Sequence, residues 1–253
     1  MISGWEVTTA GWRAPASHGD TDRSYPAIPP KLRRLSSNSK PKIPYVSINT
    51  STMSAKVTAT GPLGEGEARW IKLIKINYDD QNGNSRTWES AERRTRPKNG
   101  EIDGVGIVAI LEKPTGPEII LQKQYRPPID KICIEVPAGL VDEGETAEQA
   151  AVRELKEETG YVGKVSETTP IMFNDPGFCN TNLRMVHVTI DTSLPENQNP
   201  KAELEEGEFI EVFTVPLSNF WAECIRLEKE GYAIDARVGT IAEGIELAKK
   251  FKL

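Results

Sequence analysis

Alternation of apolar and polar residues predicts a series of β-strands after residue 68. In residues 69–78 apolar side chains (Trp70, Ile74 and Ile76 among them) recur at even positions, which is the period of a strand. Residues 79–84 are a run of Asp, Gln, Asn and Gly, and 86–95 follows as a return strand, so we expect a β-hairpin here. Further strand-like runs are 104–111, 118–125, 185–192 and 209–215.

Three other segments are typical of helices: 146–159, 218–230 and 238–251. Strands and helices follow one another in irregular order, without the regular βαβ alternation of a parallel-sheet fold, and no internal repeat is visible. The pattern therefore predicts a mixed α/β or α+β domain.

Residues 1–52 show neither period and are rich in Ser, Pro, Thr and Asn, so we expect them to be mostly disordered. Four arginines in this stretch suit a mitochondrial transit peptide, whereas three acidic residues argue against one. A third interpretation is that translation begins at Met53. The sequence leaves these alternatives open.

The composition is that of a soluble globular protein, with 38% hydrophobic and 27% charged residues among 253. No apolar run approaches the ~20 residues that cross a bilayer, and no secretory signal is visible. We expect a cytoplasmic or nuclear location, or a mitochondrial one if the tail is a transit peptide, and no membrane partner. The net charge of −6 argues against a nucleic-acid polymer as partner.

Residues 139–161, GLVDEGETAEQAAVRELKEETGY, are the most informative segment. Thr146 and Gln149 have the spacing of a capping box, which predicts the start of a helix near Thr146. Gly160 is a residue that adopts a positive φ without strain, and it predicts the end of that helix. The helix is therefore expected over 146–159.

Three glutamates of this helix, Glu154, Glu157 and Glu158, lie at i, i+3 and i+4 and share one face. Like charges at this spacing destabilise a helix, and they lie toward its C-terminal end, where the macrodipole disfavours negative charge. A divalent cation with oxygen ligands would neutralise them, and Mg²⁺ suits carboxylates combined with waters and phosphate oxygens. Arg153 can pair with Glu145 or Glu157 and hold the cluster in register.

The segment closely resembles the Nudix box, a pattern of glycine, five residues, glutamate, seven residues and R-E-U-x-E-E-x-G-U, in which U is a bulky aliphatic residue. Of the positions that the pattern specifies, only the last departs, with an aromatic residue that packs and does no chemistry. The matching positions here are Gly139, Glu145, Arg153, Glu154, Leu155, Glu157, Glu158, Gly160 and Tyr161.

Outside the box, the chain from about residue 68 onward resembles the ADP-sugar pyrophosphatase branch of the Nudix hydrolases. The similar stretches are RTWESAERRTR, DGVGIVAIL, QKQYRPPID, CIEVPAGLVDEGET, DPGFCN, EEGEFIEV and IDARVGT. The resemblance implies an α/β/α sandwich around a mixed sheet over residues 96–253. It also implies an N-terminal β-hairpin extension over 68–95, used for dimerisation and adenine binding, after a tail of residues 1–67.

The resemblance also implies a metal site. Its ligands would be Glu154, Glu157 and Glu158, together with the backbone carbonyl of Ala138, and Mg²⁺ would be the cofactor, with Mn²⁺ as a substitute. Glu208 resembles the glutamate that positions the attacking water, although local sequence does not separate it from Glu206. With the box glutamates and Arg153, Glu208 completes the expected catalytic set.

For the substrate, the resemblance implies a nucleotide sugar bound between two subunits of a homodimer. A tryptophan from each subunit would sandwich the adenine, Glu89 would bond its edge, two arginines would clamp phosphate and ribose, and Asp175 would reach in from the partner subunit. The expected substrate-binding residues are Trp70, Trp88, Glu89, Arg93, Arg126, Glu135 and Asp175.

The residues offer no rival nucleophile to metal-assisted hydrolysis. Gly-x-Ser-x-Gly and Walker motifs are absent, and His18 and His187 are interpreted as structural or incidental. The three scattered cysteines, Cys133, Cys179 and Cys224, form no zinc pattern and are interpreted as buried free thiols.

The expected reaction is Mg²⁺-dependent hydrolysis of ADP-ribose and related ADP-sugars to AMP and a sugar phosphate. One alternative is a Nudix hydrolase that acts on another nucleoside diphosphate derivative. Another is an ADP-ribose-binding regulator without turnover.

Overall fold

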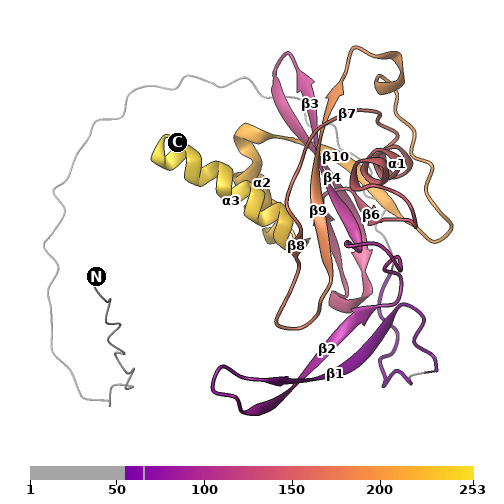
Figure 1. Ribbon diagram of the computed structural model, residues 1–253. Helices are drawn as coiled ribbons and strands as arrows, with labels where there is room; N and C mark the ends of the chain where they lie inside the picture. The colour runs from indigo at the N-terminus through magenta and orange to yellow at the C-terminus, as the bar shows by residue number, and fades with distance from the viewer. Residues whose placement is uncertain (1–54, 65) are drawn as a thin grey trace, which may run out of the picture. The chain divides into compact units, whose positions relative to one another are not determined.

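The computed structural model describes residues 55–64 and 66–253 (Figure 1). The interpretations of residues 1–52, the alternative start at Met53 and the placement of His18 lie outside the described residues. Within the described ranges, none of the helices combines the length and apolar character that a bilayer crossing requires.

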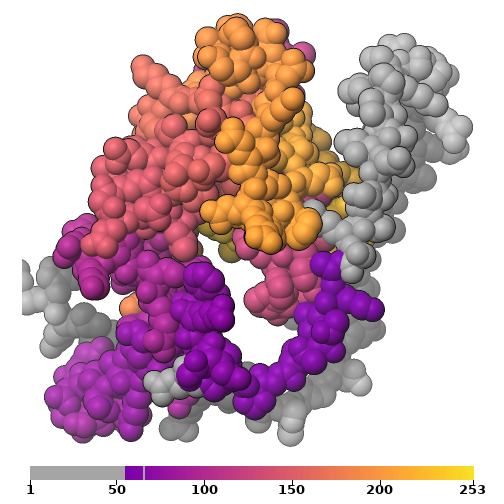
Figure 2. Space-filling model, turned by 90° about the vertical axis from the view of Figure 1, so that its right-hand side faces the viewer, coloured from indigo at the N-terminus to yellow at the C-terminus, as the bar shows by residue number. Residues whose placement is uncertain are grey.

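The predicted hairpin is confirmed as a two-stranded antiparallel sheet of β1 (Ile71–Asp79) and β2 (Ser85–Arg93). Asp80 organises its turn, because Oδ1 accepts hydrogen bonds from the backbone N–H groups of Asn82 and Asn84. Among the described residues the hairpin forms no ladder with the main sheet, and its isolated bridge from Ala91 reaches Cys179, in the loop between β8 and β9. In the space-filling view much of its purple surface is uncovered (Figure 2).

The remaining strands form one mixed sheet. Its order is β11-β5-β4-β3-β9-β7, with β10 paired to β4, β6 to β3 and β8 to β9. The central strand β3 runs antiparallel to β4 but parallel to β9. The strands are β3 (Gly104–Lys113), β4 (Gly116–Arg126), β5 (Lys131–Glu135), β6 (Ala138–Leu140), β7 (Lys164–Thr168), β8 (Met172–Phe173), β9 (Asn182–Asp191), β10 (Ile210–Pro216) and β11 (Ala233–Ile234).

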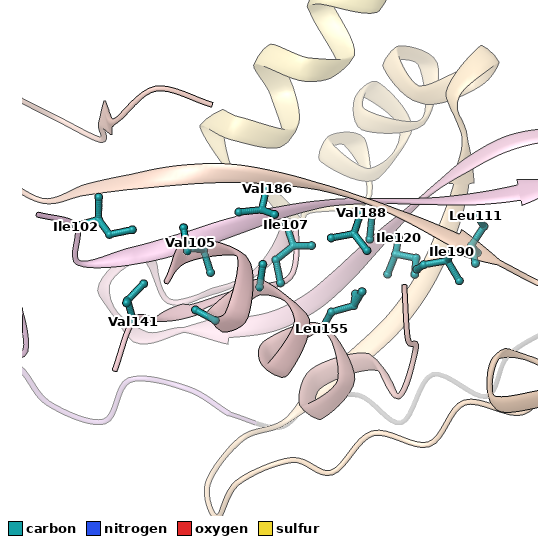
Figure 3. Packing of buried hydrophobic residues seen from close by; sticks show 14 residues of the cluster. Ile102, Val105, Ile107, Leu111, Ile120, Val141, Leu155, Val186, Val188 and Ile190 are labelled. Carbon is teal, nitrogen blue, oxygen red and sulfur yellow. The ribbon is translucent and has the colours of Figure 1, made fainter. Parts of the chain in front are cut away.

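Helices cover both faces of this sheet (Figure 1). On one face, Ile107 and Leu111 of β3 pack with Leu155 of α1, in the cluster drawn in Figure 3. On the other face, Val108 packs in a second cluster with Phe220. Side chains of a strand alternate between its faces, so β3 serves both cores, and the α/β/α sandwich is confirmed. The helices are α1 (Ala147–Thr159), α2 (Phe220–Lys229) and α3 (Ala236–Phe251), with 3₁₀ turns η1 (Pro127–Ile129), η2 (Pro195–Asn197) and η3 (Leu217–Asn219).

The observed helix starts differ from the predicted ones by one or two residues. Helix α3 starts at Ala236, two residues before the predicted start, because the Asp235 carboxylate accepts from the Arg237 backbone N–H and caps it. The predicted helix 218–230 begins as η3 and becomes α2 at Phe220. Five strands, β5, β6, β7, β8 and β11, were not predicted, because each has five residues or fewer and shows too little periodicity.

Gly160 is the residue at which helix α1 ends, and its substitution tests this helix end. Its φ is 75°, and a Cβ placed there would lie 2.3 Å from the Lys201 backbone nitrogen. Gly160→Ala therefore adds a steric clash to backbone strain, and we expect it to lower the free energy of unfolding by about 2–4 kcal/mol. Chemical denaturation measures this change.

Gly83→Ala is the matched control. Gly83 has a similar φ of 78° but nothing within 4 Å of the added Cβ. We expect only the backbone penalty there, about 1 kcal/mol. Equal losses in the two variants would contradict the proposed steric constraint against Lys201.

Candidate active site

Helix α1 positions the acidic cluster. At its N-terminus the Thr146 side chain accepts from the Gln149 backbone N–H, and the Gln149 side chain accepts from the Thr146 N–H, so the predicted capping box is confirmed. Leu155 anchors the inward face of the helix in the core. This leaves Glu154 and Glu158, one residue before and three residues after Leu155, at the boundary between core and solvent.

Glu158 is the most buried of the three box carboxylates, with 4% of the residue exposed. Its Oε2 accepts from the Ala138 backbone N–H at 2.9 Å, and its Oε1 accepts from Gln122 Nε2 at 3.4 Å. Burial raises the pKa of the Glu158 carboxyl to about 8, and the charges of Glu154 and Glu208 act in the same direction. Burial likewise raises the pKa of Glu154.

Arg153 is the arginine of the box. Its Nη1 lies 2.7 Å from Glu154 Oε1 and 3.1 Å from Glu157 Oε2, while Nε and Nη2 bond both oxygens of Glu145 at 3.0 Å. Nη2 also donates to the Leu140 carbonyl. The hydrogen bond to Glu145 is the main cause of a raised pKa of Arg153. Arg153 thereby ties the loop before α1 to the acidic face of the helix.

The donor set suits a divalent cation. As the side chains lie, no three His, Cys, Asp or Glu groups among residues 55–64 and 66–253 form a ready metal cage. Glu154 is bonded to Arg153 and Glu158 to the Ala138 N–H instead. In the described part of the chain Glu158 is buried without a cationic partner, Glu154 beside it is half-buried, and carboxylate oxygens are the ligands that Mg²⁺ or a similar ion accepts. The residues therefore fit such an ion.

The acidic cluster borders a cleft of about 1050 Å³. Besides Arg153, three arginines reach the same cleft, Arg93, Arg126 and Arg237, and carboxylates bind two of these three. Arg126 bonds Glu135 at 2.7 and 2.6 Å, and Arg237 bonds Asp235 through Nε and Nη2 at 2.8 and 2.9 Å. The charged residues that line the cleft are Arg93, Asp103, Arg126, Asp142, Arg153, Glu154, Glu157, Glu205, Glu208, Asp235 and Arg237.

Comparison with known proteins decides the family. The NUDIX domain model matches residues 101–236, which include the box, the cleft-lining segment of β4 and the start of α3. The chain belongs to the Nudix family. The resemblance inferred from the box is thus confirmed.

Several Nudix relatives match most of this chain. An ADP-ribose pyrophosphatase of Saccharomyces cerevisiae is 53% identical over 189 residues, which cover 74% of this chain and 81% of the relative. An uncharacterized Nudix hydrolase of Schizosaccharomyces pombe is 48% identical, with coverages of 78% and 95%. An ADP-sugar pyrophosphatase of Mus musculus is 40% identical, with coverages of 68% and 79%.

The cleft of this Nudix protein gathers part of the expected site. The residues that line it from that set are Arg93, Arg126, Ala138, Arg153, Glu154, Glu157 and Glu208. Glu158 and Glu135 lie buried behind the wall, where Glu135 holds Arg126. Trp70, Trp88, Glu89 and Asp175 do not line the cleft.

The two tryptophans of the hairpin region lie outside the cleft lining, unlike Arg93 of β2. Trp70 is 67% exposed and Trp88 is 48% exposed. Trp88 Nε1 donates to the Gly177 carbonyl at 3.0 Å, which ties the hairpin to the loop that contains Asp175. The Asp175 carbonyl in turn accepts from the backbone N–H groups of Phe178 and Cys179. The structure thus groups Trp88 with the loop that contains Asp175, next to the cleft-lining Asn174.

The sequence analysis assigns no role to the paired Arg237 and Asp235 of the cleft. They lie in the stretch IDARVGT, which resembles the family.

The structure favours Glu208 over Glu206 as a residue of the site. Glu208 lines the cleft, and its charge raises the pKa of both Glu154 and Glu158. Glu206 does not line the cleft.

The raised pKa of Glu158 predicts a pH dependence of stability. In the unfolded chain this carboxyl titrates near pH 4.3, whereas in the folded, metal-free protein it titrates at about 8. Between these values the folded state binds the additional proton, so the stability from this group is present at low pH and decreases as pH rises toward 8. We expect the Tm of the metal-free protein to decrease from pH 6 to pH 8 by more than that of Glu158→Gln.

Thermal denaturation in a chelator, at matched ionic strength, measures both slopes. Glu158→Gln keeps the shape of the side chain but does not titrate. Parallel Tm profiles for the two proteins over this range would show that Glu158 is ionised throughout.

Proposed function

We propose that this protein hydrolyses the diphosphate of ADP-ribose and related ADP-sugars, giving AMP and a sugar phosphate, with Mg²⁺ as cofactor and Mn²⁺ as a substitute. The observation that carries the proposal is a cleft of about 1050 Å³ that brings Glu154 and Glu157 of the box together with Arg93, Arg126 and Arg237. A diphosphate ester requires charge neutralisation on both sides of the scissile bond. The names of the S. cerevisiae and M. musculus relatives support this substrate class.

The proposed metal ligands are Glu154, Glu157, Glu158 and the carbonyl of Ala138. When bound, the ion supplies Lewis-acid activation of a phosphate oxygen and lowers the pKa of a coordinated water. The chain's own groups do the rest: the guanidinium of Arg126, held from behind by Glu135, donates to phosphate oxygens.

Glu208 is the proposed general base. It lines the cleft, and its carboxylate is close enough to Glu154 and Glu158 to affect their pKa values. Its Oε2 also accepts from the Glu205 backbone N–H at 3.0 Å, a bond within the same loop that limits where the carboxylate points. From this position Glu208 takes the proton of the attacking water.

The hairpin supports a homodimer as the functional unit. Trp88 pairs with Ile76, which lies six residues along β1 from Trp70, so the two indoles are separated by roughly 20 Å at about 3.3 Å per residue. Two aromatic groups that stack on both faces of one base lie about 7 Å apart. One chain therefore does not sandwich an adenine, whereas tryptophans from two chains do. The exposed apolar side chains of the hairpin offer contact surface for the second copy: Ile71, Leu73, Ile76 and Tyr78.

Trp88 and Glu89 are neighbours in β2 and point to opposite faces of the hairpin. In the proposed dimer Trp88 stacks on the face of an adenine, and Glu89 bonds an adenine edge. The hydrogen bond from Trp88 to the Gly177 carbonyl, two residues after Asp175, supports a role for Asp175 near Trp88.

Product analysis tests the reaction. The purified protein is incubated with Mg²⁺ and ADP-ribose, or with a panel of other nucleoside diphosphate derivatives, and products are separated by chromatography. We expect AMP and ribose 5-phosphate from ADP-ribose, and a decrease in kcat of about 10³-fold or more in Glu158→Gln, because an essential carboxylate ligand is lost. Glu228→Gln, on the exposed face of α2, is the control and keeps full activity.

The other outcomes contradict specific parts of the proposal. Cleavage of a different nucleotide, with ADP-ribose left intact, would disprove the substrate assignment and keep the chemistry. Tight ADP-ribose binding without product at excess Mg²⁺ or Mn²⁺ would indicate a regulator instead of an enzyme. Normal turnover by Glu158→Gln would remove Glu158 from the metal site.

Trp88→Ala tests the adenine clamp. Removing one stacking surface costs about 1–3 kcal/mol of binding, so we expect KM for ADP-ribose to rise by about 5- to 150-fold with kcat nearly unchanged. Trp88→Phe retains an aromatic face and should recover most of the affinity. Steady-state kinetics measures both, and an unchanged KM in Trp88→Ala would place the adenine elsewhere.

A further inference from the structure

Gln122 is a fully buried amide in the middle of strand β4. Its residue exposure is 0%, the same as that of the preceding Ile119, Ile120 and Leu121. An amide transferred from water into such surroundings costs about 1–3 kcal/mol unless hydrogen bonds compensate it. An apolar residue would pack here without that cost, so the amide calls for an explanation in terms of what it contacts.

The contact that Gln122 makes is with the box. Even-numbered residues of β4 face α1, as Ile120 does in the α1 core cluster. On that face Gln122 Nε2 donates to Glu158 Oε1 at 3.4 Å, while the Ala138 N–H bonds the other oxygen. Gln122 also pairs across the sheet with Glu135, which holds Arg126. Gln122 thus lies next to Glu158 of the acidic cluster and next to Glu135, the carboxylate that binds Arg126.

The acceptor end of the same amide has no partner. Gln122 Oε1 is one of three buried side-chain atoms within the described residues that lack a hydrogen bond. The other two are Thr95 Oγ1 and Asn180 Oδ1. An unsatisfied buried oxygen next to an acidic cluster favours an incoming donor, and a hydrated divalent cation brings water molecules that donate.

We propose that Gln122 is a positioning residue for the metal site, which rests on the metal assignment made under the proposed function. Its N–H group holds one oxygen of Glu158 so that the carboxylate keeps a single orientation toward the cation. Its free Oε1 receives a donor that arrives with the hydrated ion. Gln122 touches neither the substrate nor the reacting atoms, so it acts on the affinity for the cation through Glu158.

Gln122→Met keeps the length of the side chain and removes both polar atoms. We expect the Kd for Mn²⁺ alone, measured from the free-ion electron paramagnetic resonance signal, to rise by about 10- to 100-fold. The Tm of the metal-free variant should be unchanged or higher, because the unpaired acceptor is gone. Excess Mg²⁺ should restore kcat on ADP-ribose, because only the occupancy of the site is impaired.

Gln124→Met is the matched control. Gln124 lies two residues along the same face of β4 and donates to no carboxylate among the described residues. It should leave the Kd for Mn²⁺ at the wild-type value. Gln122→Leu repeats the test in case the methionine variant does not fold.

Two other results are decisive. If Gln122→Met or Gln122→Leu lowers Tm and leaves the Kd for Mn²⁺ unchanged, Gln122 has only a packing role and the proposal is wrong. If Glu158→Gln binds Mn²⁺ as tightly as the wild type, the metal assignment itself fails. The first result leaves the proposed hydrolysis intact, so the two failures are distinguishable.

Discussion

The burial of the Glu158 carboxylate is the constraint on which the rest of the site depends. A carboxyl with 4% exposure does not keep its charge without compensation, and its pKa rises to about 8. Compensation comes from the Ala138 N–H on one side and the Gln122 amide on the other, so β6 and β4 must both lie against α1. The sandwich thereby holds a carboxyl group at the edge of its core, and a nearby cation would favour its ionised form.

Arginines of the cleft are held in fixed orientations by carboxylates. Arg153 is fixed by Glu145, Arg126 by Glu135 and Arg237 by Asp235, and each pair has hydrogen bonds of 3.0 Å or less. A guanidinium that is already oriented loses little conformational entropy when it binds a phosphate. Seven carboxylates and four arginines are the Asp, Glu and Arg residues that line the cleft, so a bound cation would reduce its negative charge and favour an anionic diphosphate.

Local chemistry made parts of this structure predictable from the sequence. Thr146 and Gln149 cap α1, Gly160 ends it, and the Asp-Gln-Asn-Gly run turns the hairpin, because each depends on residues close in the chain. The pairing of Gln122 with Glu158 and of Glu135 with Arg126 depends on strand register, which short strands such as β5 do not reveal. The separation of Trp70 from Trp88 likewise required the observed hairpin register.

The central claim is that the box glutamates hold a divalent cation, and locating that ion is its most direct test. Crystals grown with Mn²⁺ would be measured at the manganese absorption edge, and an anomalous difference map calculated. The account predicts a peak within about 2.0–2.6 Å of carboxylate oxygens of Glu154 and Glu158, the usual range for oxygen-ligated divalent ions. Bound Mn²⁺ at another place, with no peak beside these two carboxylates, would contradict it.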